Sequence, residues 1–254
     1  MSIIPIAKNT FKEAIRDKIL YIIILFSILM ISSSILLSHL SVGQNQKIIV
    51  DIGLAIINLF GVLITLFVGT TLLNKEIEKK TIYLLLTKPL RRSDFILGKH
   101  LGLSYTLFIV MAIMTLCFYG ILMFQGMPLS FAYLQAIFLS YIELVLLISV
   151  AIFFSTFASP IMSSMYTLGV YMMGHFSKDF LTMGKLSKNE TFMKFSEYVY
   201  YILPDLEKLN LKNIALYLPE QTMSELFFPS TIYGLLYTTI VLVMAIFVFE
   251  FKEF

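Results

Sequence analysis

The residue types that could do chemistry are few in this chain and widely separated. The three histidines, His39, His100 and His175, are far apart, and the single cysteine, Cys117, lies inside an apolar run as a small hydrophobe would. We therefore expect no zinc, copper or haem site, since these need His and Cys ligands at short spacing. Glu143 differs from the other acids because it lies in the middle of an apolar run. An ionisable group there either lines a pathway or pairs with hydroxyl groups of a neighbouring helix.

The sequence also lacks a phosphate-binding loop. The pair Gly98-Lys99 is followed by His100 where that loop has Ser or Thr, and Ser93 stands where the loop needs Gly. We therefore expect that the chain is not an enzyme, does not hydrolyse ATP by itself and holds no cofactor. Gly98 and Gly102 form a small-xxx-small pair, which predicts close packing of helices at this point.

The composition defines the class of protein that must position these residues. Of the 254 residues, 58% are apolar and 14% charged, whereas soluble domains have about 45–50% and about 25%. Such an excess predicts a membrane protein, because too little charge remains to cover a soluble core of this size. The net charge of +3 is too small to indicate nucleic acid as a partner, and one cysteine excludes an internal disulfide.

Long runs with few or no charges predict an all-α polytopic membrane protein of six transmembrane helices in one domain, 1–254. A bilayer needs about 20 apolar residues for each helix. The runs are 19–40, 52–73, 101–124, 131–154, which carries Glu143, the shorter 160–176, and 231–249.

The distribution of Lys and Arg predicts the orientation. Basic residues are concentrated in segment 1–18 and in segment 74–100, and short loops of this kind are cytoplasmic. Six spans place both termini on the same side, so we expect both in the cytoplasm of a bacterium, with the chain in its plasma (inner) membrane.

Two polar segments have helical amphipathic patterns. Within segment 1–18, residues 5–18 place Ala7, Phe11, Ala14 and Lys18 on one helical stripe, which predicts an interfacial helix; the other basic residues lie on a second stripe (Lys8, Lys12 and Arg16). The basic residues alone would also suffice to fix the orientation. Segment 177–229 has an apolar stripe that ends before Pro204 and predicts a second interfacial helix on the outer leaflet (Phe192, Phe195, Val199 and Ile202). The pattern of this outer segment fits two functions equally: a gate or docking surface for an extracytoplasmic partner, or a lid that only covers the helix bundle.

Segment 74–100 has the pattern helix, break, helix, with the break at Pro89. Residues 82–86 are all apolar although the segment is expected on the cytoplasmic side. A solvated loop needs no such run, so these side chains predict contact with a partner protein or with the membrane interface.

The same segment resembles the permease subunits of ATP-binding-cassette (ABC) transporters of the type-2 exporter class. These share a motif between their second and third spans that the chain matches at Glu76, Lys80, Thr81, Ile82, Leu85, Leu86, Pro89, Leu90, Arg92, Phe95, Gly98 and Lys99. Many members have Gly where this chain has Lys80. Residues 201–213 are most similar to the branch that includes the permease of the nitrous-oxide reductase copper-maturation transporter.

The resemblance implies a mechanism and partners. In this class the segment is a coupling helix that fits a groove of a separate ATPase subunit, which binds the ATP, and two permeases work with two ATPases. The resemblance implies that Thr81, Leu85, Leu86 and Pro89 shape this contact, with Glu76 and Arg92 as charge partners.

The sequence therefore predicts a permease subunit, working as a dimer in the lipid bilayer, that couples ATP hydrolysis by its partner to translocation. The alternative is a polytopic scaffold that docks a cytoplasmic protein through residues 76–99. An intramembrane enzyme would need a pair of catalytic groups at membrane depth, and only Glu143 is clearly there. Lipid, peptide, drug and sulfur species all remain open as substrates.

Overall fold

The computed structural model describes residues 3–16, 25–26, 28–30, 32, 45–70, 92–187, 189–217 and 220–251. Throughout these residues the regular structure is helical and includes no strand. Most of the predicted first span, 19–40, lies outside them, as do residues 71–91 of the predicted coupling segment.

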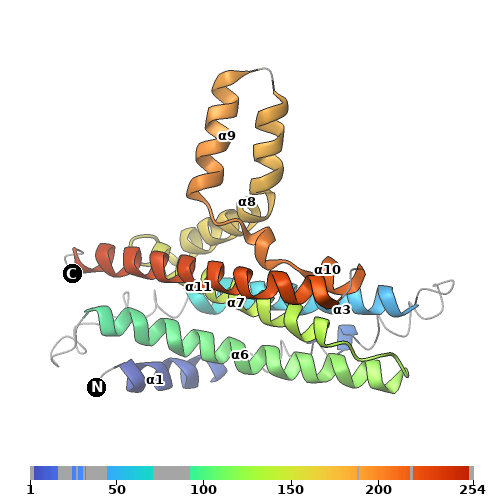
Figure 1. Cartoon of the computed structure of the whole chain (residues 1–254). Helices are drawn as coiled ribbons and strands as arrows, with labels where there is room; N and C mark the ends of the chain where they lie inside the picture. The colour runs from blue at the N-terminus through green and yellow to red at the C-terminus, as the bar shows by residue number, and fades with distance from the viewer. Residues whose placement is uncertain are drawn as a thin grey trace.

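Four long helices form the body of the molecule (Figure 1). They are α3 (Asn45–Ile64), which continues as the π-helical turn η1 (Thr65–Gly69), α6 (Arg92–Phe124), α7 (Phe131–Ser155) and α11 (Glu220–Glu250). Each contains a segment long and apolar enough to cross a membrane, and these segments overlap the second, third, fourth and sixth predicted spans. The all-helical, membrane-spanning architecture is thus confirmed, while the count of six spans stays a prediction.

Helix α7 is the central element. It begins after Ser130, whose side chain accepts a hydrogen bond from the Ala132 amide at 3.1 Å and caps the first turn. Side chains around most of its circumference are buried, as expected for a helix that is apolar on every face. It contacts α3, α6, α8 and α11, so every other long helix packs against it.

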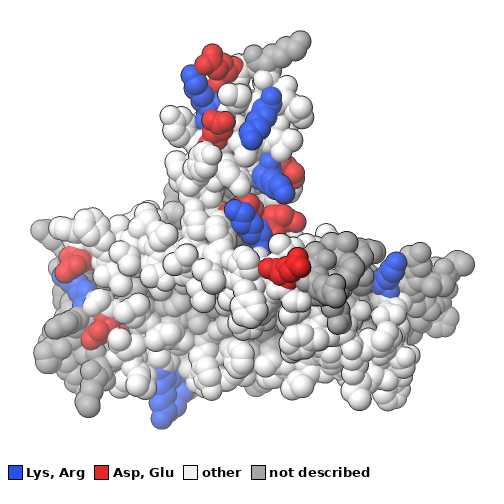
Figure 2. Space-filling view, in the orientation of Figure 1, with Lys and Arg blue, Asp and Glu red and all other residues white. Residues whose placement is uncertain are grey.

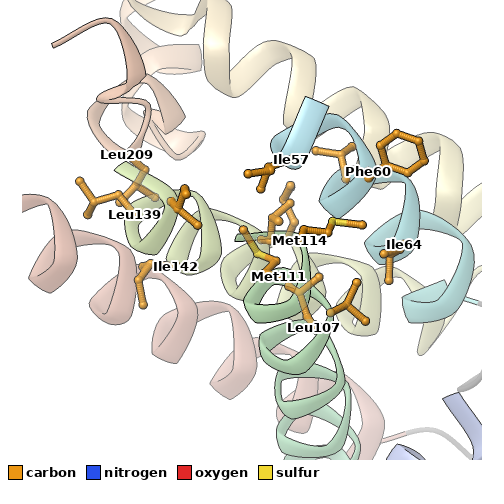
Figure 3. Close-up of a cluster of buried hydrophobic side chains, with 14 of the residues drawn as sticks. Ile57, Phe60, Ile64, Leu107, Met111, Met114, Leu139, Ile142 and Leu209 are labelled. Atoms are coloured by element: carbon orange, nitrogen blue, oxygen red, sulfur yellow. The ribbon is translucent and has the colours of Figure 1, made fainter. Parts of the chain in front are cut away.

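The apolar core lies where α3, α6 and α7 meet (Figure 3). All of the labelled side chains are at most 5% exposed. They come from α3 (Ile57, Phe60, Ile64), α6 (Leu107, Met111, Met114), α7 (Leu139, Ile142) and the short 3-10 helix η2 (Leu206–Leu209), which contributes Leu209.

Helix α1 (Ile3–Arg16) packs lengthwise on α6. A Cβ atom at Gly98 would lie 2.8 Å from the Ile6 side chain, and one at Gly102 would lie 2.6 Å from the Ala7 carbonyl oxygen. The small residues of α6 therefore let the two backbones approach closely. The apolar stripe that the sequence suggested for a membrane surface contributes to this contact, since Ala14 is fully buried and the Phe11 ring lies 4.9 Å from the Tyr105 ring.

Helix α8 (Pro160–Leu186) is longer than the predicted span 160–176. Its polar last part and α9 (Glu190–Ile202) stand side by side and project from the body of the molecule (Figure 1), with charged side chains along them (Figure 2). Phe180 of α8 packs against Phe192 and Phe195 of α9, with ring centroids 5.5 and 6.2 Å apart. Part of the apolar stripe predicted for a membrane interface therefore faces the partner helix of this hairpin.

Candidate functional site

Glu143 lies inside the helical body with no solvent exposure. Its Oε1 atom is 2.8 Å from Nε2 of His175 on α8. Its Oε2 atom is buried as well and has no hydrogen-bond partner among the residues that the structure describes. The His175 ring is therefore the polar contact that this buried carboxyl group makes with another described side chain.

His175 connects Glu143 to a second carboxylate. Its Nδ1 atom lies 3.2 Å from Oε2 of Glu207 on η2. The exposed fraction of the side chains rises along this series, from 0% at Glu143 to 16% at His175 and 44% at Glu207. We call these three residues the carboxylate–imidazole chain; it leads from a buried acid to the molecular surface.

Hydrogen-bond chemistry limits the protonation states of the carboxylate–imidazole chain. An ionised carboxylate only accepts hydrogen bonds, while a neutral imidazole donates from one nitrogen and accepts at the other. Both contacts of His175 are satisfied either by an imidazolium between two carboxylates or by a neutral imidazole beside one protonated carboxyl group. The site can therefore hold a proton in more than one place without moving a heavy atom.

The packing of α7 against α8 brings these residues together. Near the turn that joins the helices, the hydroxyl groups of Ser155 and Ser163 are 2.8 Å apart, and Ser163 also donates to the Ala151 carbonyl at 3.2 Å. From there the helices run antiparallel, so that Glu143 and His175 meet on facing sides.

A glycine on α8 allows η2, which carries Glu207, to come close to His175. A Cβ atom at Gly174 would lie 2.6 Å from Cγ of Leu206 and 2.9 Å from the Pro204 carbonyl oxygen. Because this position is glycine, η2 can approach α8 closely enough for Glu207 to reach His175.

Further polar groups surround the carboxylate–imidazole chain. The Lys212 ammonium, on α10 (Lys212–Tyr217), is attracted by Glu143, Glu207 and Asp51; burial lowers its pKa, and the three carboxylates oppose that shift. The Tyr171 ring lies 4.7 Å from the His175 ring, and its hydroxyl shares a hydrogen bond with Asn58 of α3.

Sequence reasoning found Glu143 but missed His175 and Glu207. The three histidines are far apart in the sequence, and their spacing does not indicate a histidine paired with carboxylates. A signal was present: Glu143 and His175 are equally far along the chain from Ser159, in the turn between their helices. Folding the two predicted spans about that turn places them opposite each other. The part of the chain that the structure describes holds no group of three or more His, Cys, Asp or Glu side chains suited to a metal ion.

Arg92 is the one predicted coupling residue that the structure describes. Its guanidinium donates hydrogen bonds to the carbonyl oxygens of Phe249 at 3.2 Å and Glu250 at 2.7 Å. The Phe95 ring stacks on Phe249, with 5.8 Å between centroids. Arg92 therefore holds the last turn of α11. A positive charge is favourable there, because the carbonyl end of a helix carries a partial negative charge. The other residues expected at the coupling contact lie outside the described ranges (Glu76, Thr81, Leu85, Leu86, Pro89).

The comparison with protein families decides the class of the protein. A family model described as "ABC-2 family transporter protein" matches residues 4–254. The chain belongs to the ABC-2 transporter family. No curated protein matches this ABC-2 chain closely enough to count as a relative. The match makes the chain a multi-pass membrane component of an ABC transporter, a class of proteins that works with an ABC ATPase.

Proposed function

We propose that this ABC-2 protein is the permease subunit of an exporter, coupling ATP hydrolysis by a separate ATPase subunit to translocation across the plasma membrane. The family match over residues 4–254 carries this proposal. In it, two permeases form a homodimer, both termini are cytoplasmic, and the segment around Thr81, Leu85, Leu86 and Pro89 docks on the ATPase. Glu76 and Arg92 provide charge near that contact, and Glu143 lies on the pathway.

The packing supports a mechanical route between the coupling segment and Glu143. The segment leads directly into α6 at Arg92, and Arg92 holds the end of α11 through Phe249 and Glu250. Helix α11 in turn packs along α7, which carries Glu143. Rigid-body movement of a docked segment would therefore shift α6 and α11 together against α7.

The first test is copurification from the native membrane. Affinity-purified protein is expected to bring an ATPase subunit with it, and Leu85→Asp or Pro89→Trp should abolish that recovery, because a charge or a bulky ring disrupts an apolar groove contact. Leu129→Asp is the matched control: Leu129 is half exposed in the connection between α6 and α7, at the other end of α6 from Arg92. Recovery of no ATPase from intact membranes would favour the scaffold function instead.

A second test concerns Glu143. Glu143→Gln is expected to impair transport while the ATPase still copurifies, because the substitution lies in α7 and leaves the sequence of the coupling segment unchanged. Undiminished transport by this variant would remove Glu143 from the pathway.

A further inference from the structure

We propose that Glu207, His175 and Glu143 form a proton relay that loads and unloads the buried carboxyl group of Glu143 from the molecular surface. The two contacts at 3.2 and 2.8 Å make a continuous hydrogen-bonded connection between the exposed end and the buried end. The relay is a property of this chain; its coupling to transport rests on the permease function proposed above.

The proton transfer balances without any other reactant. Inward transfer begins with Glu207 protonated, His175 neutral with its proton on Nε2, and Glu143 ionised. The proton of Glu207 passes to Nδ1, which gives an imidazolium between two carboxylates, and the Nε2 proton then passes to Oε1 of Glu143, so one O–H and one N–H bond break and one of each forms. The imidazole ends as its other tautomer, and Glu207 is left ionised. The reverse sequence returns the proton to the surface.

The tight packing around Glu143 favours a proton over any larger cation. Its neighbours along α7, Ile142 and Leu144, press against Gly234 of α11 and Gly61 of α3, where an added Cβ would lie 2.5 and 2.3 Å from their side chains. Glu143 itself has no exposed surface, so a metal ion or an organic ammonium would have to displace packed side chains to reach it. A proton needs no cavity and moves along hydrogen bonds already formed.

The charged and titratable groups around the relay come from several elements. Asp51 of α3 and Lys212 of α10 act on it electrostatically, and Tyr171 lies beside the His175 ring. Within the described part of the chain, Glu143 Oε2 and Asn58 Oδ1, on α7 and α3, are buried acceptors without a hydrogen-bond partner. Binding a proton removes the charge of a carboxylate that solvent does not reach, which is where neutralisation stabilises most.

Histidine labelled with nitrogen-15 gives a direct test in the full-length chain, purified into lipid nanodiscs without ATPase. The chain has only three histidines, so the His175 signal is assigned by its loss in His175→Gln. Spectra recorded from about pH 5 to pH 9 should show its ring nitrogens titrating. In Glu143→Gln the midpoint should fall by about one pH unit or more, because the imidazolium loses a charged partner. An infrared band of a protonated carboxyl group should titrate in the original protein and be absent from this variant.

Glu190→Gln is the matched control. Glu190 is an exposed carboxylate of α9, paired with Lys194 at 2.8 Å, and its replacement should leave the His175 titration unchanged. Should Glu143→Gln fail to fold, Glu207→Gln tests the exposed end and is expected to shift the midpoint in the same direction by less, since solvent screens that carboxylate. A His175 signal that does not titrate over this range, or titrates identically in the carboxylate variants, would overturn the relay.

Coupling to transport is tested separately on the reconstituted complex. The pH profile of its ATPase activity should change in His175→Gln and stay as it was in Glu190→Gln. An unchanged profile together with a titrating His175 would keep the relay and reject its coupling. A titrating His175 in a protein that recovers no ATPase would keep the relay and reject the permease function.

Discussion

Lys99 and Glu143 are both buried charged residues, but they are paired in different ways. The Lys99 side chain is 1% exposed, and its Nζ atom lies 3.8 Å from Oε2 of Glu13, which is 37% exposed, and 5.9 Å from the Phe95 ring centroid. Glu143 reaches a half-exposed partner, Glu207, only through the His175 ring. Both buried charges are thus connected to the surface, one directly and one through an imidazole.

The difference lies in what the intermediate groups can do. An ammonium group only donates hydrogen bonds, so the pair of Lys99 and Glu13 holds α1 against α6 and carries no proton onward. An imidazole accepts at one nitrogen while it donates from the other, so the chain through His175 can change its protonation state without changing its geometry. The α1–α6 contact is accordingly structural, while the carboxylate–imidazole chain can respond to pH.

Removing the imidazole should have the largest effect. His175→Leu leaves Glu143 as a buried charge without its ring partner, which we expect to lower the free energy of unfolding by about 3–5 kcal/mol. Thermal or SDS-induced unfolding of the purified protein measures this loss. The double variant Glu143→Leu with His175→Leu should recover most of it, because a buried charge no longer remains. A double variant as unstable as His175→Leu alone would show that the loss comes from packing.

Crowding the α1–α6 contact should have an intermediate effect. Gly102→Ala places a methyl group 2.6 Å from the Ala7 carbonyl oxygen, and we expect a loss of about 1–3 kcal/mol from overpacking. Gly120→Ala on the same helix is the control, since, apart from its own stretch of helix, no described atom lies within 4 Å of its added Cβ. The control should be neutral or slightly stabilising through higher helix propensity. Equal losses in the two variants would contradict a close contact at Gly102.

Releasing the end of α11 should have the smallest effect on stability. Arg92→Ala removes the two hydrogen bonds to Phe249 and Glu250 and should cost about 0.3–1 kcal/mol. Hydrogen exchange should accelerate in the last turn of α11 and stay unchanged in α7. Replacing the exposed Lys8 of α1 with Ala is the charge-matched control. Protection of the α11 end that survives in Arg92→Ala would show that Arg92 does not hold it.

Much of the architecture could be predicted from apolar periodicity and length. The runs that became α3, α6, α7 and α11 are charge-poor over the length that a bilayer requires of a helix, and a helix satisfies its backbone groups internally in lipid. The end of α8 was harder to predict. The apolar run stops at Phe176, but helix propensity does not, and the polar continuation is stabilised by α9 through contacts of Phe180 that no local pattern reveals.

The candidate site, like the fold, could be predicted from the sequence only in part. The sequence alone determined that Glu143 would be exceptional, because a carboxylate in the middle of an apolar run must be paired, protonated or functional. Only the tertiary structure decided which residues it meets, since His175 and Glu207 depend on the antiparallel packing of α7 with α8 and on the close approach of η2 at Gly174. Local sequence fixes the cost of burying a charge; the partners that compensate it are distant in the chain, and packing alone brings them within hydrogen-bond distance.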